Sequence, residues 1–382
     1  MDVVERCEQL EAEGRTICHM EVGQPASGAP SKVIEAAKTA LNSDKLGYTN
    51  AKGIKPLREA IATSYKTKYG IDIPSERVIV TTGSSAAFMF AFLGCFDQDD
   101  NIGLCSSGYP CYRNLMKALG LNYISIPVNK EYKVTSKELK EEIIRRKENN
   151  LKPLKGLILS NPSNPTGAML DKQEVSDLCK TCDDNGICFI SDEIYHGISY
   201  GKTEHSALEF SDQALIINSF SKYYSMTGWR LGWMVVPTEM INVMNKLSQN
   251  MYINAPTLSQ ISAIEAFNCE EELQSHVARY SKNRAIVLST LESLDLLSGA
   301  SPSDGAFYVY VDLKHAGVDD APKLCKRILE EAGVALTPGV DFEDAESGLG
   351  LQRVRFSYSR STDEVEEGMK RFKTWWLQNM AK

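Results

Sequence analysis

The stretch ALIINSFSKYYSMTGWRLGW, residues 214–233, joins an apolar run to a polar segment that carries two basic side chains. Its first five residues predict a buried strand, and Lys222 and Arg230 follow the end of that strand. Open α/β sheets bind their ligands at the carboxyl ends of their strands, so this position suggests a ligand site. Solvent-facing side chains would fit the same pattern, and the rest of the chain has to decide between the two interpretations.

Several other apolar runs resemble this one, and amphipathic helical patterns separate most of them. The predicted strands span 77–82, 101–105, 123–128, 156–160, 187–191 and 215–219, and the helices between them span 84–94, 111–119, 136–148 and 172–185. Near-continuous apolar strands separated by helices indicate a mainly parallel sheet that is covered by helices on both faces. We therefore expect an α/β fold in which the strand carboxyl ends lie along one crevice.

The pattern changes after about residue 270 and indicates a smaller α+β unit. A long helix at 271–294 is followed by AFYVYVDL, a helix at 321–332, the alternating run RVRFSYS and a last helix from about 362. We expect a large domain at 41–284, a small domain formed by 1–40 and 285–382, and the crevice between them. The helix at 31–42, with Ser31 as its N-cap, is expected to pack with the smaller unit.

The composition is typical of a soluble globular protein, with 382 residues, 43% hydrophobic and 24% charged. The formal net charge of −8 argues against nucleic acid or an anionic membrane as the main partner. The longest apolar run, 86–96, is shorter than the roughly 20 residues that a membrane span needs. The N-terminal segment MDVVERCEQLEAEG predicts an acidic helix rather than a signal peptide, so we expect a cytoplasmic protein. Because Met1 stands almost inside that helix, the sequence leaves open whether a further segment precedes it.

Cysteine and histidine spacings give little support to a metal site. Cys179 and Cys182 form a C-x-x-C with Cys188 nearby, but they lie on a predicted helix and no second pair has zinc-like spacing. We expect the ten cysteines to be reduced and mostly buried. None of the five histidines has a metal-ligand spacing, so no metal is predicted, and His196 is expected to be a packing residue.

Polar residues follow two of the strands in ways that could serve a ligand. Gly83, Ser84 and Ser85 open a helix directly after the strand 77–82, and free N–H groups at a helix start bind phosphate. Taken alone, this segment is better explained by a plain N-cap turn. Asn164 lies in the rigid loop NPSNPTG, where an ordinary Asx-turn is the alternative.

Asp192 and Tyr195 follow another strand. Together with Lys222 and Arg230 they complete the polar residues at strand ends that could bind a ligand. A buried Asp192 would need a cationic partner, although a helix N-cap would also explain an aspartate here. A partly desolvated Lys222 would have a depressed pKa and could form an imine with a carbonyl, while Arg230 could bind a phosphate in bidentate fashion. An imine-forming amine, an anion cradle, a buried carboxylate and a phenol together match one cofactor, pyridoxal 5′-phosphate.

At this point the sequence resembles the fold-type I, pyridoxal-phosphate-dependent enzymes of the class I/II aminotransferase family. The resemblance runs through nearly the whole chain in the family's order, in the segments EVGQP, GYTNAKGIKPLREAIA, TTGSS, GYPCY, NPSNPTG, SDEIY, SFSK, GWRLGW and VRFSYS. It implies a large domain with a mainly parallel sheet between helices and a smaller α+β domain. It also implies a ping-pong transfer of an amino group between an L-amino acid and a 2-oxo acid, through a Schiff base at Lys222.

The resemblance implies roles for individual residues, matched by position. Lys222 matches the Schiff-base lysine and Asp192 the acid paired with the pyridine nitrogen. Tyr195 and Asn164 match the groups that contact the 3′-oxygen of the ring. The matched phosphate ligands are Ser219, Arg230 and the amides around Gly83, Ser84 and Ser85.

Further matches concern the ring face, the substrate and a second subunit. Tyr109 matches the aromatic residue stacked on the pyridine ring, although Ser107 stands where the family usually has proline. Arg355 matches the arginine that binds the substrate α-carboxylate, with Gly23 and Asn164 in the same pocket. Arg353, two residues away on the same face of the strand, is an alternative to Arg355.

Tyr48 matches a tyrosine that reaches the phosphate of the neighbouring subunit, so the resemblance implies a homodimer with shared active sites. The side-chain pocket is less readable, and 24–30 and 249–260 are expected to contribute to it. Neither segment carries an arginine, which favours neutral or aromatic substrates over dicarboxylic ones.

Two other functions are compatible with these motifs. A β-lyase, a cyclopropane-carboxylate synthase or a racemase could use the same lysine, aspartate and arginine. A non-catalytic sensor domain of a transcription regulator would need a DNA-binding domain before Met1.

Overall fold

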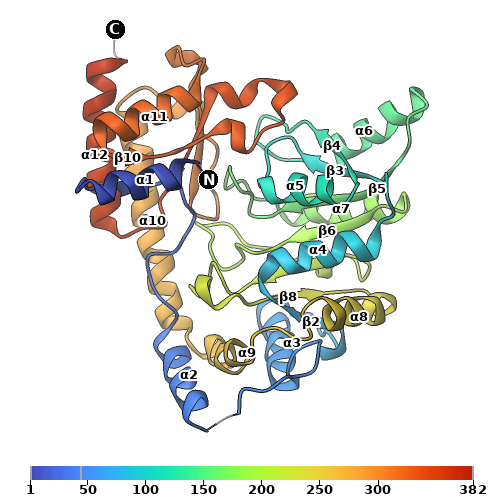
Figure 1. Ribbon diagram of the computed structural model, residues 1–382. Coiled ribbons are helices and arrows are strands. Elements are labelled where there is room, and N and C mark those ends of the chain that lie inside the picture. Colours follow the sequence, from blue (N-terminus) through green and yellow to red (C-terminus); the bar gives the residue numbers. More distant parts are fainter. Residues whose placement is uncertain (1, 44, 381–382) are drawn as a thin grey trace.

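The computed structural model describes residues 2–43 and 45–380, and its elements alternate along the chain as Figure 1 shows. The helices are α1 Asp2–Ala12, α2 Ser31–Ser43, α3 Lys55–Tyr69, α4 Gly83–Cys95, α5 Pro110–Ala118, α6 Ser136–Glu148, α7 Lys172–Asp184, α8 Ile241–Met251, α9 Thr257–Ala263, α10 Glu270–Glu292, α11 Ala321–Ala332 and α12 Thr362–Asn379. The strands are β1 Cys18–His19, β2 Val78–Thr81, β3 Asn101–Cys105, β4 Asn122–Ile126, β5 Leu154–Ser160, β6 Cys188–Asp192, β7 Leu215–Ser219, β8 Gly232–Val235, β9 Tyr308–Asp312, β10 Val334–Ala335, β11 Thr337–Pro338 and β12 Arg353–Ser357.

A seven-stranded sheet forms the centre of the larger unit, in the order β2-β8-β7-β6-β5-β3-β4. The pairs β3–β4, β3–β5, β5–β6 and β6–β7 are parallel, whereas β8 runs antiparallel to both of its neighbours. The mainly parallel sheet expected from the apolar runs is therefore confirmed. Because β5, β6 and β7 run in the same direction, their carboxyl ends meet at one edge of the sheet.

The alternation of side chains along β5 shows why both faces of the sheet need helices. Leu157 and Leu159 belong to a core shared with apolar side chains of α3, α6 and α7, whereas Ile158 belongs to the core on the side of α4, α5 and α8. Successive side chains of a strand point to opposite faces. A strand that carries apolar side chains on both of its faces therefore requires a helical layer on each side, as Figure 1 shows.

A smaller unit with its own core carries the second half of the crevice. Its three-stranded sheet has the order β11-β12-β9, all antiparallel, and packs with α10, α11 and α12. The N-terminal segment joins this unit, because β1 pairs in parallel with β10 and α1 packs on the apolar side chains around Leu329 and Ala335. This arrangement confirms an α+β unit, whereas the domain boundaries at 40/41 and 284/285 stay a prediction.

The expectation for the helix at 31–42 is only partly met. The body of helix α2 packs on α9 and on the adjoining 3-10 helix Ile264–Asn268, and its first residue contacts α10 of the smaller unit. Ser31 is the first residue of the helix rather than its cap, and its N–H and hydroxyl both donate to the carboxylate of Glu272. An acid from α10 therefore replaces the local cap that the sequence pattern suggested.

Within the described residues, no helix is both long and apolar enough to cross a membrane. All ten cysteines are free thiols, and six of them are buried. This agrees with the expectation of reduced and mostly buried cysteines.

Candidate active site

The crevice between the two sheets is a cleft of about 440 Å³ that collects most of the predicted site residues. The carboxyl ends of β6 and β7 supply one wall, and β9, β11 and β12 supply the other. Ten of the predicted residues line it: Gly23, Ser84, Ser85, Tyr109, Asn164, Asp192, Tyr195, Lys222, Arg230 and Arg355. These residues are far apart in the sequence, and the topology of the sheets brings them together.

Lys222 lies three residues beyond the end of β7, and its amine faces the N-terminal segment across the cleft. Its Nζ donates a hydrogen bond to the carbonyl oxygen of Gly23 at 2.7 Å. Burial is the main cause that lowers the pKa of Lys222 from 10.5 to about 8; Arg355 and Arg230 lower it further, while Asp192 opposes the shift. A substantial fraction of this amine is therefore neutral, and hence nucleophilic, near neutral pH.

Asp192 is the last residue of β6 and is almost completely buried, with 3% of its surface exposed. Burial raises its pKa to about 6, and hydrogen bonds from the Tyr112 hydroxyl and the N–H of Ile194 limit the rise by stabilising the carboxylate. The sequence interpretation missed Tyr112, although it lies in the quoted segment GYPCY, one helical turn after Tyr109. A buried acid with donors on both oxygens is ready to pair with a cationic group of a ligand.

Tyr195 and Tyr308 bring two phenols together beside Lys222. Their hydroxyls are 2.9 Å apart, and burial raises the pKa of both above 10. Tyr308 also passes so close to Gly23 that a Cβ built on this glycine would lie 1.7 Å from its hydroxyl. Gly23 therefore has no room for a side chain, and sequence reasoning did not single out Tyr308.

Arg355 enters the cleft from β12, whereas Arg353 does not line it. The Arg355 guanidinium donates to Oδ1 of Asn164 at 2.8 Å and to the carbonyl oxygen of Glu21, and its Nε is buried without a partner. Arg353 pairs instead with Asp312 and Glu343, at 3.3 and 2.7 Å. The sequence offered both arginines as candidates for binding the substrate carboxylate, and the structure places them in different environments.

One end of the cleft has the features of an anion cradle. Gly83 opens α4 directly after β2 with a φ of +71°, and a Cβ on it would lie 2.8 Å from Nη2 of Arg230. Ser84 and Ser85 follow in the first turn of α4, where backbone N–H groups have no partner within the helix. The guanidinium and the helix N-terminus therefore point to the same anionic group.

Ser219, Tyr109 and Tyr48 differ in how far they reach the cleft. The Ser219 hydroxyl is buried and donates to the carbonyl oxygen of Leu231, and Ser221 rather than Ser219 reaches the cleft wall. Tyr109 precedes α5 and is 38% exposed, and burial of the remainder raises its pKa to about 12. Tyr48 is 84% exposed and does not line the cleft of its own chain.

Ser107 stands where the family pattern has proline. It is fully buried, and its backbone forms an isolated antiparallel β-bridge with Glu343. His196, expected to be a packing residue, is also buried, and its Nδ1 lies 2.5 Å from the Tyr69 hydroxyl. Neither residue lines the cleft.

This fold and this set of side chains define a class of enzyme, and comparison with known proteins agrees. Residues 15–372 match the family model described as aminotransferase class I and II. The valine–pyruvate aminotransferase of Mycobacterium tuberculosis is 40% identical over 365 residues, covering 94% of this chain and 91% of that protein. The aspartate aminotransferase of Bacillus subtilis is 30% identical over 383 residues, covering 97% and 94%.

Solved structures give the same answer. The crystal structure of an aminotransferase from Mycobacterium tuberculosis superposes with a TM-score of 0.93 at 38% identity, covering 99% of this chain and 96% of that one. The chain belongs to the class I and II aminotransferase family and has the fold-type I architecture. It is an aminotransferase, a transferase of nitrogenous groups, and its family uses pyridoxal phosphate.

Proposed function

We propose that the cleft binds pyridoxal 5′-phosphate through Lys222 and that the enzyme exchanges amino groups between neutral L-amino acids and 2-oxo acids by a ping-pong route. The observation that carries the proposal is the meeting of the Lys222 amine, the Asp192 carboxylate and the Arg355 guanidinium in one cleft. Each of these groups matches a different part of the chemistry: covalent attachment, stabilisation of a cationic ring nitrogen and binding of a carboxylate.

The residues present fit this cofactor. The cleft volume of about 440 Å³ lies in the range of small-molecule sites. The space that a side chain on Gly83 would fill is left open beside Arg230, as an anion cradle requires. The buried Nε of Arg355 has no acceptor within the described residues, and such a donor favours an added anion.

Each residue would hold a different part of the cofactor. Lys222 would hold the aldehyde carbon, Asp192 the ring nitrogen, and Tyr195 and Asn164 the 3′-oxygen. Tyr109 would lie on the ring face, and the phosphate would be held by Arg230 and by the first turn of α4, from Gly83 to Ser85, with Ser221 at the cleft wall and Ser219 bonded behind it. When bound, this cofactor supplies an electron sink that makes the substrate α-proton acidic.

The protein itself has to move that proton, and Lys222 is the group placed to do so. With a pKa of about 8, its Nζ would accept a proton from the substrate α-carbon and pass it on to the cofactor carbon that takes over the amine, because general bases work best near the operating pH. The hydrogen bond to Gly23 O restrains the direction of the amine. Asp192 stays a carboxylate above a pH of about 6, which keeps its negative charge available to the ring nitrogen.

Arg355 orients the substrate. An arginine presents paired N–H donors in a plane, so a carboxylate bound to it is fixed in orientation as well as in position. Its contacts with Asn164 and the backbone of Glu21 hold the guanidinium in place before a substrate arrives. The α-hydrogen is then presented to Lys222 in one direction, which is how positioning lowers a barrier.

The cleft favours amino acids with a neutral side chain. Among its described lining residues, the cationic groups are Lys222, Arg230 and Arg355, and the proposed cofactor and α-carboxylate engage all three. The lining also includes apolar side chains, namely Val3, Val4, Phe88, Ile194 and Phe342. The valine–pyruvate activity in the name of the Mycobacterium tuberculosis relative supports the same choice.

A half-reaction measurement tests this function. Purified, cofactor-loaded enzyme is mixed with single amino acids, and the loss of the lysine-bound form and the release of 2-oxo acid are followed by stopped-flow absorbance. Valine and alanine are expected to react at least about 10-fold faster than aspartate, the ratio expected when a charged side chain has no partner. Release of ammonia and pyruvate without an acceptor would instead indicate a lyase.

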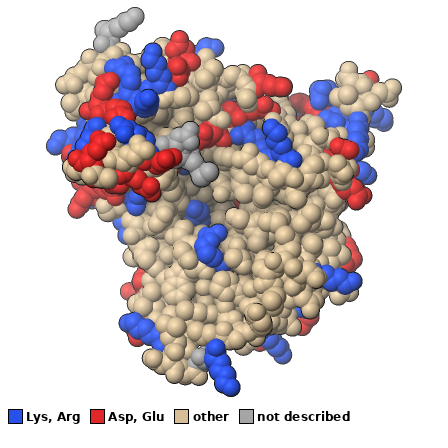
Figure 2. Space-filling view, in the orientation of Figure 1, with Lys and Arg blue, Asp and Glu red and all other residues tan. Residues whose placement is uncertain are grey.

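The homodimer is part of the same proposal. Figure 2 shows that charged side chains gather on the upper part of this face, whereas the surface over α4 and β8 is largely uncharged. Apolar side chains are exposed on and near α4 and α8, namely Tyr48, Leu93, Val243, Met251 and Ile253. An exposed apolar surface of this kind marks an interface. Sedimentation equilibrium should give twice the chain mass of 42.4 kDa, and Val243→Asp should lower it.

A further inference from the structure

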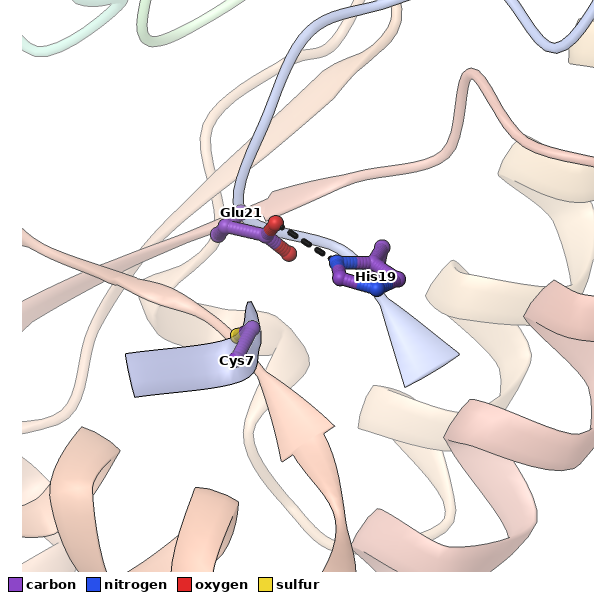
Figure 3. Close-up of side chains that lie close together, drawn as sticks. All are labelled: Cys7, His19 and Glu21. Atoms are coloured by element: carbon purple, nitrogen blue, oxygen red, sulfur yellow. Dashed lines mark hydrogen bonds and ion pairs between the residues drawn. The ribbon is translucent and has the colours of Figure 1, made fainter. Parts of the chain in front are cut away.

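A cluster of three metal-ligating side chains lies outside the cleft, where α1 meets β1. Cys7 comes from α1, His19 from β1, and Glu21 follows two residues later (Figure 3). Their ligand atoms all lie within 4.8 Å of one another, and no other group of three such residues within the described residues meets this spacing. Tetrahedral zinc with sulfur and nitrogen ligands needs separations of about 3.5 Å, so a shift of about 1 Å would suffice.

The cluster is mostly buried, with the His19 side chain 18% exposed, and it has an unused ligand atom. Cys7 is completely buried and Glu21 is 4% exposed. Oε1 of Glu21 lies 2.8 Å from Nδ1 of His19, and Figure 3 shows the carboxylate turned toward the ring. Oε2 of Glu21 is buried without a partner. A buried carboxylate oxygen without a donor is costly, and a metal ion would satisfy it.

Glu11 adds the outer contact that metal-binding histidines usually have. Its Oε1 lies 3.0 Å from Nε2 of His19, on the ring nitrogen opposite the one that faces Glu21. A carboxylate that accepts from one ring nitrogen leaves the other free as a ligand and orients the ring. Thiolate, imidazole and carboxylate are the side-chain ligands that zinc takes in proteins, and a carboxylate behind a ligating imidazole is common.

We propose that Cys7, His19 and Glu21 bind a divalent transition-metal ion of the zinc type. A thiolate and a carboxylate balance the two positive charges, and a soft sulfur ligand favours zinc over magnesium or calcium. Sequence spacing gave no hint of this site, because Cys7 and His19 are brought together only when α1 folds back on β1.

The site would connect α1 to the active-site cleft. The carbonyl oxygen of Glu21 accepts hydrogen bonds from Arg355 and from Oγ1 of Thr337, and Val3 and Val4 of α1 line the cleft. A metal ion held by Cys7 and Glu21 would fix the helix to the segment that positions Arg355. This consequence rests on the proposed function, whereas the metal site itself does not.

Metal binding to the full, cofactor-loaded chain tests the proposal. After chelation and dialysis, the protein is titrated with Zn²⁺ against a competing chelator, and with Co²⁺ while the thiolate-to-metal absorption in the near ultraviolet is recorded. The variants are Cys7→Ser, His19→Gln and Glu11→Gln. The matched controls are Cys18→Ser, a buried cysteine on β1 next to His19, and Cys182→Ser in the C-x-x-C.

One Zn²⁺ per chain is expected for the wild type and both controls. Loss of affinity should exceed about 100-fold in Cys7→Ser and His19→Gln and be about 10-fold in Glu11→Gln. Unchanged affinity in Cys7→Ser and His19→Gln, or wild-type protein with neither bound Zn²⁺ nor a Co²⁺–thiolate band, would overturn the proposal and leave an ion pair between His19 and Glu21. Circular dichroism checks each fold, and His19→Gln decides the result if Cys7→Ser is unfolded.

Discussion

The Tyr112 hydroxyl donates a hydrogen bond to the carboxylate of Asp192, which links the first turn of α5 to the end of β6. The ring of Tyr112 also packs edge-on against Tyr109, with centroids 5.5 Å apart at 87°. One side chain therefore positions both the buried acid and the aromatic residue proposed for the ring face. This makes Tyr112 a positioning residue for the proposed cofactor site.

Replacing Tyr112 with phenylalanine should weaken the site without disturbing its shape. The lost hydrogen bond stabilises the carboxylate, so its removal raises the pKa of Asp192 above its present value of about 6. Cofactor affinity should fall by about 10-fold or more, the usual effect of one hydrogen bond to a charged group. The acid limb of the activity profile should move to higher pH, which a kcat/KM profile measures. Tyr123→Phe, on β4, is the control, and an unmoved acid limb in Tyr112→Phe would contradict this role.

The pKa of Lys222 predicts how cofactor capture depends on pH. At pH 7, a lysine with a pKa of about 8 has about 300 times the neutral fraction of one at 10.5. The rate at which cofactor-free protein gains its visible absorption should therefore rise with pH up to about 8 and level off above. Lys222→Ala should form no borohydride-reducible adduct. A rate that still rises between pH 9 and 10, or an adduct on another lysine, would contradict the proposal.

The two neighbouring arginines of β12 should behave differently when each is changed to lysine. Arg355→Lys loses the planar pair of donors in the cleft, so KM for every amino and oxo acid should rise by about 10-fold or more. Arg353→Lys changes partly buried ion pairs with Asp312 and Glu343 outside the cleft lining, so its effect should fall on stability and KM should stay within about 2-fold. Steady-state kinetics with two donors compares them. A larger KM effect in Arg353→Lys would exchange the two roles.

The contact between Gly23 and Tyr308 predicts a sharp steric effect. An alanine Cβ at Gly23 would lie 1.7 Å from the Tyr308 hydroxyl, whereas one at Gly28 would meet nothing within 4 Å. Gly23→Ala must displace Tyr308 or the backbone that accepts from Lys222. We expect kcat/KM to fall by at least about 10-fold, because small displacements of positioned groups are costly. Gly28→Ala should match the wild type. Equal activities of the two variants would contradict the predicted clash and show that the segment around Gly23 moves at little cost.

Glu193 makes stability depend on pH although it lies outside the cleft lining. Its Oε1 accepts from Ser191, Ser206 and the N–H of Ala207, while its buried Oε2 accepts no hydrogen bond and lies 3.6 Å from Nδ1 of His196, and burial raises its pKa to about 8. The folded protein thus keeps a proton that the unfolded chain releases near pH 4.5, so stability falls as pH rises from about 4.5 to 8. Glu193→Gln should lack this decline. The difference in Tm between variant and wild type should grow over that range and stay constant above it, and a constant difference throughout would contradict the shifted pKa.

The sequence by itself determined the layers of the fold and many of the residues that line the cleft. The consecutive apolar residues Leu157, Ile158 and Leu159 of β5 point to both faces of the sheet, which requires helices on both sides, and parallel strands then align their carboxyl ends. The ordered motifs identified the family and named ten residues that line the cleft. These features are local, because periodicity and motifs depend only on residues that are neighbours in the sequence.

Only the tertiary structure decided which groups act on one another. It separated Arg355 from Arg353, brought Ser221 rather than Ser219 to the cleft wall, and placed α2 on α9. It also introduced Tyr112 and Tyr308, and it joined Cys7 to His19. Each of these results depends on contacts between segments distant in the sequence, where packing and burial, not the residue type, set the partner and the pKa.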